Sequence, residues 1–474
     1  MAKLLRCFFL LLFIGVSGAA WAQTGAISGK VLDETKQPVI GAIIEVSQGG
    51  TVRGGAASDE DGNYVIKPLN PGTDYEVSVK YTGYQEMRLT KVQITADRTT
   101  YQNFNLKVNA TEREVVNVVE YKVPLIKKDE PGISQTITGE QFQKMATRNT
   151  NDAVSLSGGT YQAKSGSAVS IGGARSNGTL YIVDGVQVNG ASGTNFAPGA
   201  IDQISTMVSG LPAKFGDALG GVVSITTKGS SPTHRGSVGA EHSVDGYNHN
   251  LLFFNLSGPL VKRKADSFGN RKPLIGYALA AQYLYDSDND PNFYKNYYVK
   301  SDKLNELRER PIVLSSSSTG IPDLRYATEF INASDLETRK RRINSQNQNI
   351  RGNANLDFQV SENANLRVGG NYSYSSGRNY SSSLALFAPD AIPVSTNYVG
   401  RGFIRYSQRL GKPASAMSGE DTKKSIISNA YYSVQADYQV DYNESQDKNH
   451  KKDPFLYNYV GKFDTKYSTL YAPM

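Results

Sequence analysis

Cysteine and tryptophan are almost absent from this 474-residue sequence, which has one of each. Cys7 lies near the N-terminus inside an apolar run, which is too early for a lipoprotein attachment site. The chain beyond Cys7 has no thiol, so disulfides, zinc knuckles and a cysteine nucleophile are excluded there.

Histidine is also scarce, and motifs typical of enzymes are missing. The histidines show no HExxH or metal-triad spacing with a suitable carboxylate; they are His234, His242, His249 and His450. No Gly-x-Ser-x-Gly turn stands between a strand and a helix. The sequence therefore predicts a protein that is not an enzyme, with no metal site and no cofactor.

Long hydrophobic runs and a strong net charge are missing too. No internal run approaches the roughly 18 apolar residues that a membrane-spanning helix needs, which excludes a helical membrane protein. The formal net charge is +7, and basic residues are not interleaved with aromatic ones, so we expect no nucleic-acid partner. Tyrosine, with 29 copies, is plentiful, and it gathers where apolar and aqueous surroundings meet.

Residues 1–22 have the pattern of a secretory signal peptide. Lys3 and Arg6 precede an apolar run from Phe8 to Ile14, and Ala20-Trp21-Ala22 fits the small-x-small cleavage pattern. The run is too short to anchor the chain in a membrane. We therefore expect everything after Ala22 to work outside the cytoplasm.

Short strands separated by turns fill residues 23–109. Apolar and polar residues alternate in Gly25–Val31 and again in Tyr75–Tyr81. Several strands with a turn signal every 8–12 residues or so predict an immunoglobulin-like β-sandwich. We expect its last strand over Thr100–Val108.

The same segment resembles the carboxypeptidase regulatory-like domain, which is not catalytic. The resemblance rests on Gly29–Val31, Pro38–Ala42, Ser58–Tyr64 and Val79–Tyr84. Asp59 and Asp61 begin like a calcium-binding loop, but Gly62 comes too early and no helices flank it. A tight turn is therefore the favoured interpretation of Asp59–Asn63.

A helix and a hairpin are predicted within residues 133–229. Thr138–Gln141 has the spacing of a capping box, so we expect one short helix from there to about Leu156. The strand Leu180–Val183 then meets an Asp-Gly dipeptide, which between β-rich runs predicts a hairpin. This segment should therefore be an α+β domain.

Two blocks of this α+β segment resemble the plug domain of TonB-dependent receptors of the bacterial outer membrane. The first is the hairpin Val183–Val186, and the second is Phe215–Lys228, which reads FGDALGGVVSITTK. The two glycines of the second block would let backbones pack closely inside a barrel lumen. The positions that match the plug motifs are Arg175, Asp184, Gly185, Asn189, Phe215, Gly216, Gly220 and Gly221.

The second block also departs from the family's pattern. Many plugs of the family carry a glutamate before it and an Arg-Gly-Pro within it, whereas residues 205–212 read STMVSGLP. These missing charges leave open whether an ion pair joins the plug to the barrel. Arg175 either faces the lumen or is a solvated loop charge.

The linker, residues 110–132, holds a β-branched stretch between charged residues. An extended segment outside a folded domain can add itself to the sheet edge of a partner. The stretch resembles the Val-rich box that TonB-dependent receptors offer to the periplasmic TonB protein, and it has the same position before the plug. The residues concerned are Glu114, Val115, Val116, Asn117, Val118 and Val119. A last sandwich strand or a stiff linker is the alternative.

Residues 230–474 contain stretches of strand length in which apolar and polar residues alternate. They include Tyr277–Tyr285, Asn353–Val360, Leu366–Tyr374 and Asn429–Tyr442. Strands of roughly ten residues with apolar-out, polar-in alternation are typical of a transmembrane β-barrel, and a soluble sandwich shows the same alternation. With a signal peptide and a plug ahead of it, we favour the barrel, with extracellular loops over 286–345 and 375–428.

The predicted fold class is mostly β: an immunoglobulin-like sandwich, an α+β plug and part of an antiparallel transmembrane β-barrel. Barrels of this family have about 22 strands. Residues 230–474 have room for only about ten strands with loops of this size. We therefore expect the chain to hold the N-terminal part of the barrel.

The resemblance implies TonB-dependent import of a small-molecule or oligomeric substrate, such as a glycan, a peptide or a metal chelate. The implied partners are TonB, outer-membrane lipid and, since the sandwich domain is common in glycan and peptide importers, a surface lipoprotein lid. Two alternatives remain open: an outer-membrane structural or adhesion protein of the same layout, and a soluble extracellular binding protein made of several sandwiches.

Overall fold

The computed structural model describes residues 24–48, 51–96, 98–108, 117–121, 132–188, 190–211, 215–216, 218–263, 273–288, 291–316, 322–361, 363–410, 430–447 and 450–453. The predicted signal peptide lies outside these residues. Within them, no helix has the length and apolar character needed to cross a bilayer.

The N-terminal segment is a two-sheet sandwich, as predicted, and we call it the sandwich. In one sheet β1 (Gly25–Leu32) pairs antiparallel with β4 (Asn63–Leu69) and parallel with β7 (Thr99–Tyr101) and β8 (Phe104–Asn105). The other sheet has the order β3-β2-β5-β6-β9. Its strands are β2 (Ile43–Gln48), β3 (Thr51–Ala57), β5 (Gly72–Lys80), β6 (Met87–Ile94) and β9 (Asn117–Glu120). Alternate side chains of both sheets, Ile27 and Val77 among them, form its core.

The single last strand predicted over Thr100–Val108 is wrong, because β7 and β8 are separate. At the break, Lys30 N donates to Asn103 Oδ1 at 2.9 Å, so a side chain takes the place of a strand hydrogen bond. Gly29 permits this, since a Cβ atom there would lie 1.7 Å from the Gln102 carbonyl oxygen.

Residues 132–228 form an α+β unit, which we call the plug segment. Its mixed sheet has the order β10-β15-β16-β13-β14, in which β13 and β16 run parallel. The strands are β10 (Ser134–Thr138), β13 (Leu180–Val183), β14 (Val186–Gln187), β15 (Ile201–Met207) and β16 (Val222–Thr227), and a separate hairpin joins β11 (Thr160–Gln162) to β12 (Val169–Ile171). Short 3-10 helices are η1 (Ser176–Gly178), η2 (Ala191–Thr194) and η3 (Pro198–Ala200).

The capping box at Thr138 is confirmed: Thr138 Oγ1 accepts from Gln141 N, and Gln141 Oε1 accepts from Thr138 N. The one helix predicted to reach Leu156 is wrong. The chain instead forms α2 (Gly139–Lys144) and α3 (Thr150–Ser155). Asn149 causes the division, because its side chain accepts from Asn151 N at 2.9 Å and caps a new helix.

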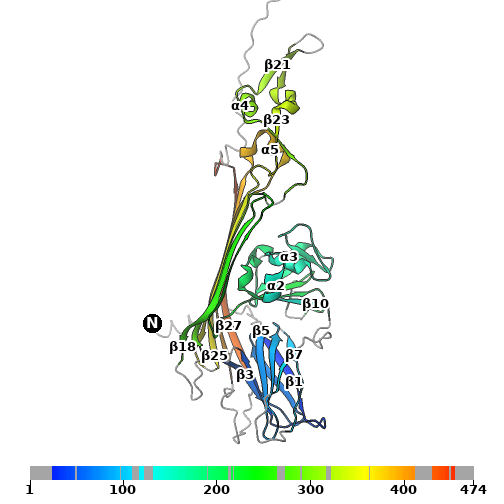
Figure 1. Cartoon of the computed structure of the whole chain (residues 1–474), viewed down its shortest axis with the longest axis vertical. Coiled ribbons are helices and arrows are strands. Elements are labelled where there is room, and N and C mark those ends of the chain that lie inside the picture. The colour runs from blue at the N-terminus through cyan, green and yellow to red at the C-terminus, as the bar shows by residue number, and fades with distance from the viewer. Residues whose placement is uncertain are drawn as a thin grey trace, which may run out of the picture.

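Seven strands follow in one antiparallel sheet, which we call the wall (Figure 1). Each strand of the wall pairs with the wall strand that follows it in the sequence. All of them except β17 have 13 to 16 residues. The strands are β17 (Arg235–His242), β18 (Asn250–Lys262), β19 (Pro273–Asp286), β24 (Asn347–Gln359), β25 (Ala364–Arg378), β26 (Val394–Arg409) and β27 (Tyr431–Gln446). The plug segment lies against one face of this sheet (Figure 1).

The two faces of the wall differ as the alternation predicted. The face away from the plug segment exposes apolar side chains, including Leu252, Phe254, Leu279, Val368, Val434 and Val440. The opposite face buries polar ones, including Gln282, Arg351, Asn355, Asn371 and Arg401. The predicted mostly β fold, with a sandwich, an α+β plug and an antiparallel barrel-type sheet, is confirmed.

The single extracellular loop predicted over 375–428 is wrong. Residues 394–409 form β26, which pairs with β25 over fifteen register positions and with β27 over sixteen. β26 ends at Arg409 and β27 begins at Tyr431, both at the sandwich end of the wall. Arg409 Nη2 donates there to the carbonyl oxygens of Arg53 and Pro68 at 2.8 and 3.0 Å.

The connections at the other end of the wall form a small folded unit, which we call the cap (top of Figure 1). Its elements are β20 (Asn296–Val299), α4 (Ser301–Glu309), β21 (Ile312–Ser316), β22 (Pro322–Tyr326), β23 (Leu336–Arg339) and α5 (Ser382–Phe387), with 3-10 helices η4 (Ala327–Phe330), η5 (Ala333–Asp335) and η6 (Pro389–Ala391). Tyr298, Ala385 and Ile392 make its apolar core. The sandwich and the cap therefore lie at opposite ends of the wall.

Candidate functional site

The hairpin residue Asp184 joins the two sequence blocks that define the plug segment. Asp184 and Gly185 have φ of 50° and 90°, as a two-residue hairpin turn requires. The buried Asp184 carboxylate accepts from Thr227 N and from Thr227 Oγ1, both at 2.9 Å. The sequence predicted the turn, but it gave no signal for the bond that ties this turn to the end of β16.

Gly220 and Gly221 lie where backbones approach closely, as predicted. A Cβ atom at Gly221 would lie 2.4 Å from Ile171 Cγ2 and 2.6 Å from the Met207 carbonyl oxygen. A Cβ atom at Gly220 would lie 2.9 Å from the Ile171 carbonyl oxygen. Both glycines therefore permit β15, β16 and the end of β12 to pack together.

The other predicted motif positions do not gather into one place. Phe215 is half-buried and packs against the small apolar cluster around Met207. Gly216 is exposed, with nothing within 4 Å of a Cβ atom added there. Arg175 is exposed beside η1. Asn189 lies outside the described residues, and the functional roles of these positions stay predictions.

Inward-facing side chains of the wall bind the backbone of the plug segment. Arg401 Nη2 donates to the Val183 carbonyl oxygen at 3.0 Å and also pairs with Asp437 on the neighbouring strand. Arg351 Nη1 donates to the carbonyl oxygens of Arg148 and Phe196 at 3.2 and 3.5 Å. The guanidinium groups thus donate hydrogen bonds to backbone carbonyl groups of the plug segment.

Amide side chains on β24 extend this interface toward the chain connection. Asn355 Nδ2 donates to Thr227 Oγ1 at 3.0 Å and to the Lys228 carbonyl oxygen at 2.9 Å. Ala197 N donates to Asn353 Oδ1 at 3.2 Å. The alternation of the sequence predicted that Asn355 faces inward, but not that it binds the plug segment.

One ion pair also joins the plug segment to the wall, a question that the sequence left open. Arg148 Nη2 lies 2.5 Å from Glu241 Oε1 on β17. Both side chains are partly exposed, at 25% and 40%, so the pair adds little stability. The hydrogen bonds between wall side chains and plug backbone therefore contribute more to this interface than the ion pair does.

A cavity of about 390 Å³ lies where sandwich, plug segment and wall meet. Charged side chains of both signs line it: Arg53, Lys228, Arg235, Arg367 and Arg405 against Asp74, Glu140, Asp184, Asp202 and Asp357. Five basic and five acidic side chains line the cavity, so neither type of side chain predominates. It is a polar space at the sandwich end of the plug segment.

Asp202 is the most perturbed carboxylate of this cavity. Its Oδ2 atom is buried and has no hydrogen-bond partner among the described residues. Burial, and next the charge of Asp74, raise the pKa of Asp202 to about 7, while Lys228 acts in the opposite direction. Burial also lowers the pKa of Lys228. The contact between sandwich and plug segment therefore contains a group that titrates near neutral pH.

The Val-rich linker stretch is described only in part. Glu114, Val115 and Val116 lie outside the described residues, whereas Asn117, Val118 and Val119 belong to β9. β9 runs parallel to β6 at the edge of the sandwich. Asn117, Val118 and Val119 therefore lie where the alternative prediction, a last strand of the sandwich, placed them.

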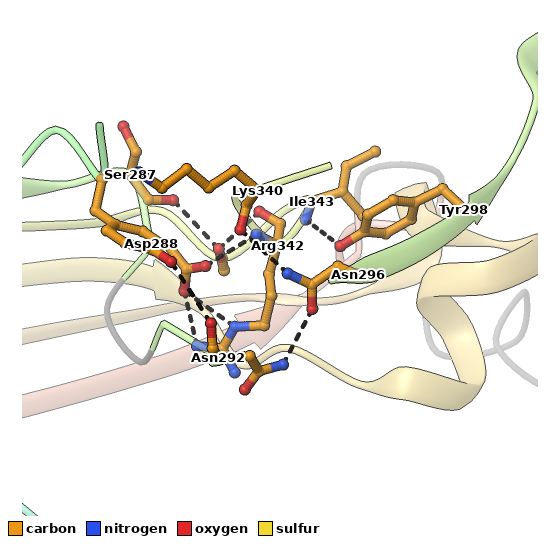
Figure 2. Close-up of polar contacts among 10 residues, drawn as sticks. Ser287, Asp288, Asn292, Asn296, Tyr298, Lys340, Arg342 and Ile343 are labelled. Atoms are coloured by element: carbon orange, nitrogen blue, oxygen red, sulfur yellow. Dashed lines mark hydrogen bonds and ion pairs between the residues drawn. The ribbon is translucent and has the colours of Figure 1, made fainter. Parts of the chain in front are cut away.

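The cap is held by a buried ion pair between its two ends (Figure 2). Arg342 donates through Nε and Nη2 to Asp288 Oδ1 at 3.0 and 2.8 Å, and Arg342 N donates to Asp288 Oδ2. The Asp288 side chain is fully buried. Ile343 N donates to Tyr298 Oη at 2.8 Å, so the same turn is fastened to β20. Arg342 belongs to the stretch 286–345, which the sequence predicted as an extracellular loop, yet its side chain is buried.

No metal centre is seen among the residues that the structure describes, where no three His, Cys, Asp or Glu side chains gather as ligands would. Three histidines have ordinary polar neighbours: His249 Nδ1 lies 2.6 Å from Asp286 Oδ1, His242 Nδ1 lies 2.7 Å from Asn250 Oδ1, and His234 Nδ1 lies 3.2 Å from Tyr277 Oη.

Two protein families match the N-terminal half of the chain. The carboxypeptidase regulatory-like domain matches residues 26–107, and the TonB-dependent receptor plug domain matches residues 126–222. No curated protein matches the chain.

Similar solved structures include the siderophore receptor PirA from Pseudomonas aeruginosa, at 15% identity and a TM-score of 0.40, over 67% of this chain and 42% of that chain. PirA from Acinetobacter baumannii is similar at 16% identity and a TM-score of 0.37, over 66% of this chain and 45% of that one. A mutant of the ferric enterobactin receptor PfeA from Pseudomonas aeruginosa has 15% identity and a TM-score of 0.36, over 68% and 47%. The chain spans less than half the length of these receptors.

Proposed function

We propose that this chain, which carries a carboxypeptidase regulatory-like domain and the plug domain of TonB-dependent receptors, takes part in TonB-dependent import across the bacterial outer membrane. The observation that carries the proposal is the plug segment itself. It continues through Lys228 directly into the wall, and wall residues such as Arg351 and Arg401 bind its backbone from the inward face.

The wall suits a membrane. The six wall strands β18, β19, β24, β25, β26 and β27 have 13 to 16 residues, whereas about 9–11 tilted residues cross the hydrocarbon core. One face exposes side chains such as Phe254 and Val434, while the other buries polar ones. Lipid would cover the apolar face, and the plug segment would fill the lumen on the polar one.

The polar contact between plug and wall suits a gate. Hydrogen bonds such as those from Arg401 and Asn355 to backbone carbonyls can be exchanged for water, whereas a close-packed apolar contact would resist movement. In this proposal the plug rearranges and a bulky nutrient (a glycan, a peptide or a metal chelate) passes. The protein acts as a transporter and not as an enzyme.

The positions of the cap and the sandwich at opposite ends of the wall suggest which end faces each side of the membrane. In an outer-membrane barrel the long connections are extracellular and the short ones periplasmic. The cap would therefore face outward, where it would meet substrate and a surface lipoprotein lid. The sandwich and β9 would lie in the periplasm, where TonB is found.

TonB would capture the linker stretch Glu114–Val119 by strand addition. A synthetic peptide over Thr111–Lys122 tests this by titration against the purified C-terminal domain of TonB. Val116→Pro, which removes one backbone N–H, is the control. Binding of the parent peptide that is lost in the proline version supports energised import. Failure of both peptides to bind would favour a structural or adhesion protein of the same layout.

A further inference from the structure

The edge strand β9 is the part of the coupling stretch that the structure describes, and it is already paired. It lies parallel to β6 in four register positions, from Met87 opposite Asn117 to Thr90 opposite Glu120. Tyr121 N donates to the Thr90 carbonyl oxygen at 2.9 Å, directly after the strand ends. The described part of the stretch that TonB would capture is therefore already paired with the sandwich.

The attachment of β9 is weak by the standards of the other strands of its sheet. It is short and parallel, and parallel pairs are slightly less stable per residue than antiparallel ones. Val118 and Val119 remain 60% and 44% exposed, so their side chains add little apolar burial. Among the side chains described for residues 117–121, the Tyr121 ring is the one that packs against the sandwich core, and it is itself partly buried.

We infer that the sandwich holds β9 as an exchangeable edge strand, and that TonB must displace it from β6 in order to bind. This inference rests on the proposed function, and it adds that β6 competes with TonB for β9. Because only the fraction of molecules with β9 detached can bind, the apparent affinity of the whole chain falls by that fraction. The sandwich would then set how readily TonB engages this protein.

The pull that TonB would exert favours displacement of β9 from β6. The alternative is that TonB adds a strand to the open edge of β9 while β9 stays paired with β6. TonB would pull on a stretch that has the sandwich on its N-terminal side and the plug segment, from residue 132, on its C-terminal side. While β9 stays on β6, the pairs between these two strands bear the load before it reaches the plug. A detached β9 transmits the load to the plug segment directly.

A disulfide across the two strands tests the inference. Arg88 and Val118 are register partners, so their Cα atoms are about 5 Å apart, within the range that a disulfide spans. Both side chains are at least partly exposed, so cysteines there spare the core. The chain's one native cysteine lies in the predicted signal peptide, so the double variant Arg88→Cys, Val118→Cys carries the only thiols of the mature chain.

The experiment measures binding of the TonB C-terminal domain to the whole mature chain in detergent, oxidised and reduced. Exchange predicts that the oxidised form binds at least about tenfold more weakly than the reduced form, and that reductant restores binding. Val118→Cys alone is the matched control and should not respond to oxidant. Equal binding of the oxidised and reduced double variant would overturn the inference.

Tyr121→Ala supplies a second measurement that does not depend on a disulfide forming. Loss of the ring weakens the attachment of β9, so exchange predicts that TonB binds the variant chain about three- to tenfold more tightly than the native chain. The same change in the free peptide measures any direct contact between Tyr121 and TonB. If TonB binds the variant chain more weakly while its affinity for the free peptide is unchanged, the exchange of β9 is overturned. If TonB binds neither the native nor the variant peptide, the proposed function is overturned, and this inference with it.

Discussion

Arg401 on β26 and Val183 on β13 connect the wall to the plug segment, although 218 positions separate them: Arg401 Nη2 donates to the Val183 carbonyl oxygen at 3.0 Å. The same guanidinium pairs with Asp437 at 2.5 Å. The Arg401 side chain is only 2% exposed, so both its ion pair and its hydrogen bond are shielded from water.

Replacement of Arg401 by methionine should loosen the hairpin of the plug segment. The change keeps the apolar stem but leaves Asp437 without its cation and removes the side-chain donor to the Val183 carbonyl, at a cost of about 3 kcal/mol. We expect backbone amides of Leu180–Gln187 to exchange hydrogen at least about tenfold faster in the whole chain. Arg325→Met, on the exposed hairpin of the cap, is the control, and equal exchange in both variants would contradict the prediction.

A double-mutant cycle can measure the coupling energy of the hydrogen bond between Asp184 and Thr227. Asp184→Ala removes both acceptors of the buried carboxylate and should lower the free energy of unfolding by about 2–3 kcal/mol. Thr227→Val removes the hydroxyl, which donates to Asp184 and accepts from Asn355. We expect a coupling energy of about 1 kcal/mol between the two changes. Urea unfolding followed by circular dichroism would measure it. Purely additive effects would show that the bond contributes nothing beyond its parts.

Gly221 and Gly216 offer a matched pair of alanine substitutions within one motif. Gly221→Ala places a Cβ atom 2.4 Å from Ile171 Cγ2 and against a backbone oxygen, so it should cost about 1–3 kcal/mol. Gly216→Ala meets open space and should be nearly neutral. Thermal unfolding of both variants tests this, and an equal loss of stability at the two positions would show that packing at Gly221 is not the cause.

Local patterns were sufficient for much of the fold. The capping box at Thr138, the hairpin at Asp184 and the inward position of Asn355 follow from spacing within a few residues. β26 was missed because the middle of the strand breaks the expected alternation, although Arg401 faces inward and Ile404 outward. Val399 and Phe403 face inward and are buried, while Gly400 and Gly402 stand on the outer face, so the stretch looked like a polar loop.

Contacts between distant parts of the chain could not be predicted from spacing. The sequence placed Arg401 and Val183 in different segments and gave no reason to join them. It likewise presented Val118 and Val119 as an extended stretch, but the identity of their neighbour β6 depends on how the sandwich ends. The candidate site is therefore largely a product of tertiary packing, with only its motif glycines and the Asp-Gly turn visible beforehand.

Asp202 should make the stability of the whole chain depend on pH. Its Oδ2 atom is buried at the contact of plug segment and sandwich, where Asp74, Asp184, Lys228 and Arg367 are the charged groups that act on it. Burial, and next Asp74, raise its pKa to about 7, against about 3.9 in an unfolded chain. Between these two values the native state binds more protons than the unfolded state, so stability falls as pH rises from about 4 to about 7.

Asp202→Asn should remove this part of the pH dependence, because an amide cannot ionise. The residue is partly exposed, so we expect the variant to gain only about 1–2 kcal/mol over the native chain at pH 8, and close to nothing at pH 4. Unfolding midpoints of both chains at the two pH values measure the difference, with Asp61→Asn in an exposed sandwich turn as the control for the loss of one carboxylate. If the native chain and Asp202→Asn lose the same stability between pH 4 and pH 8, the titrating group at this contact is another residue. The contact between the sandwich and the plug segment would then not depend on the charge of Asp202.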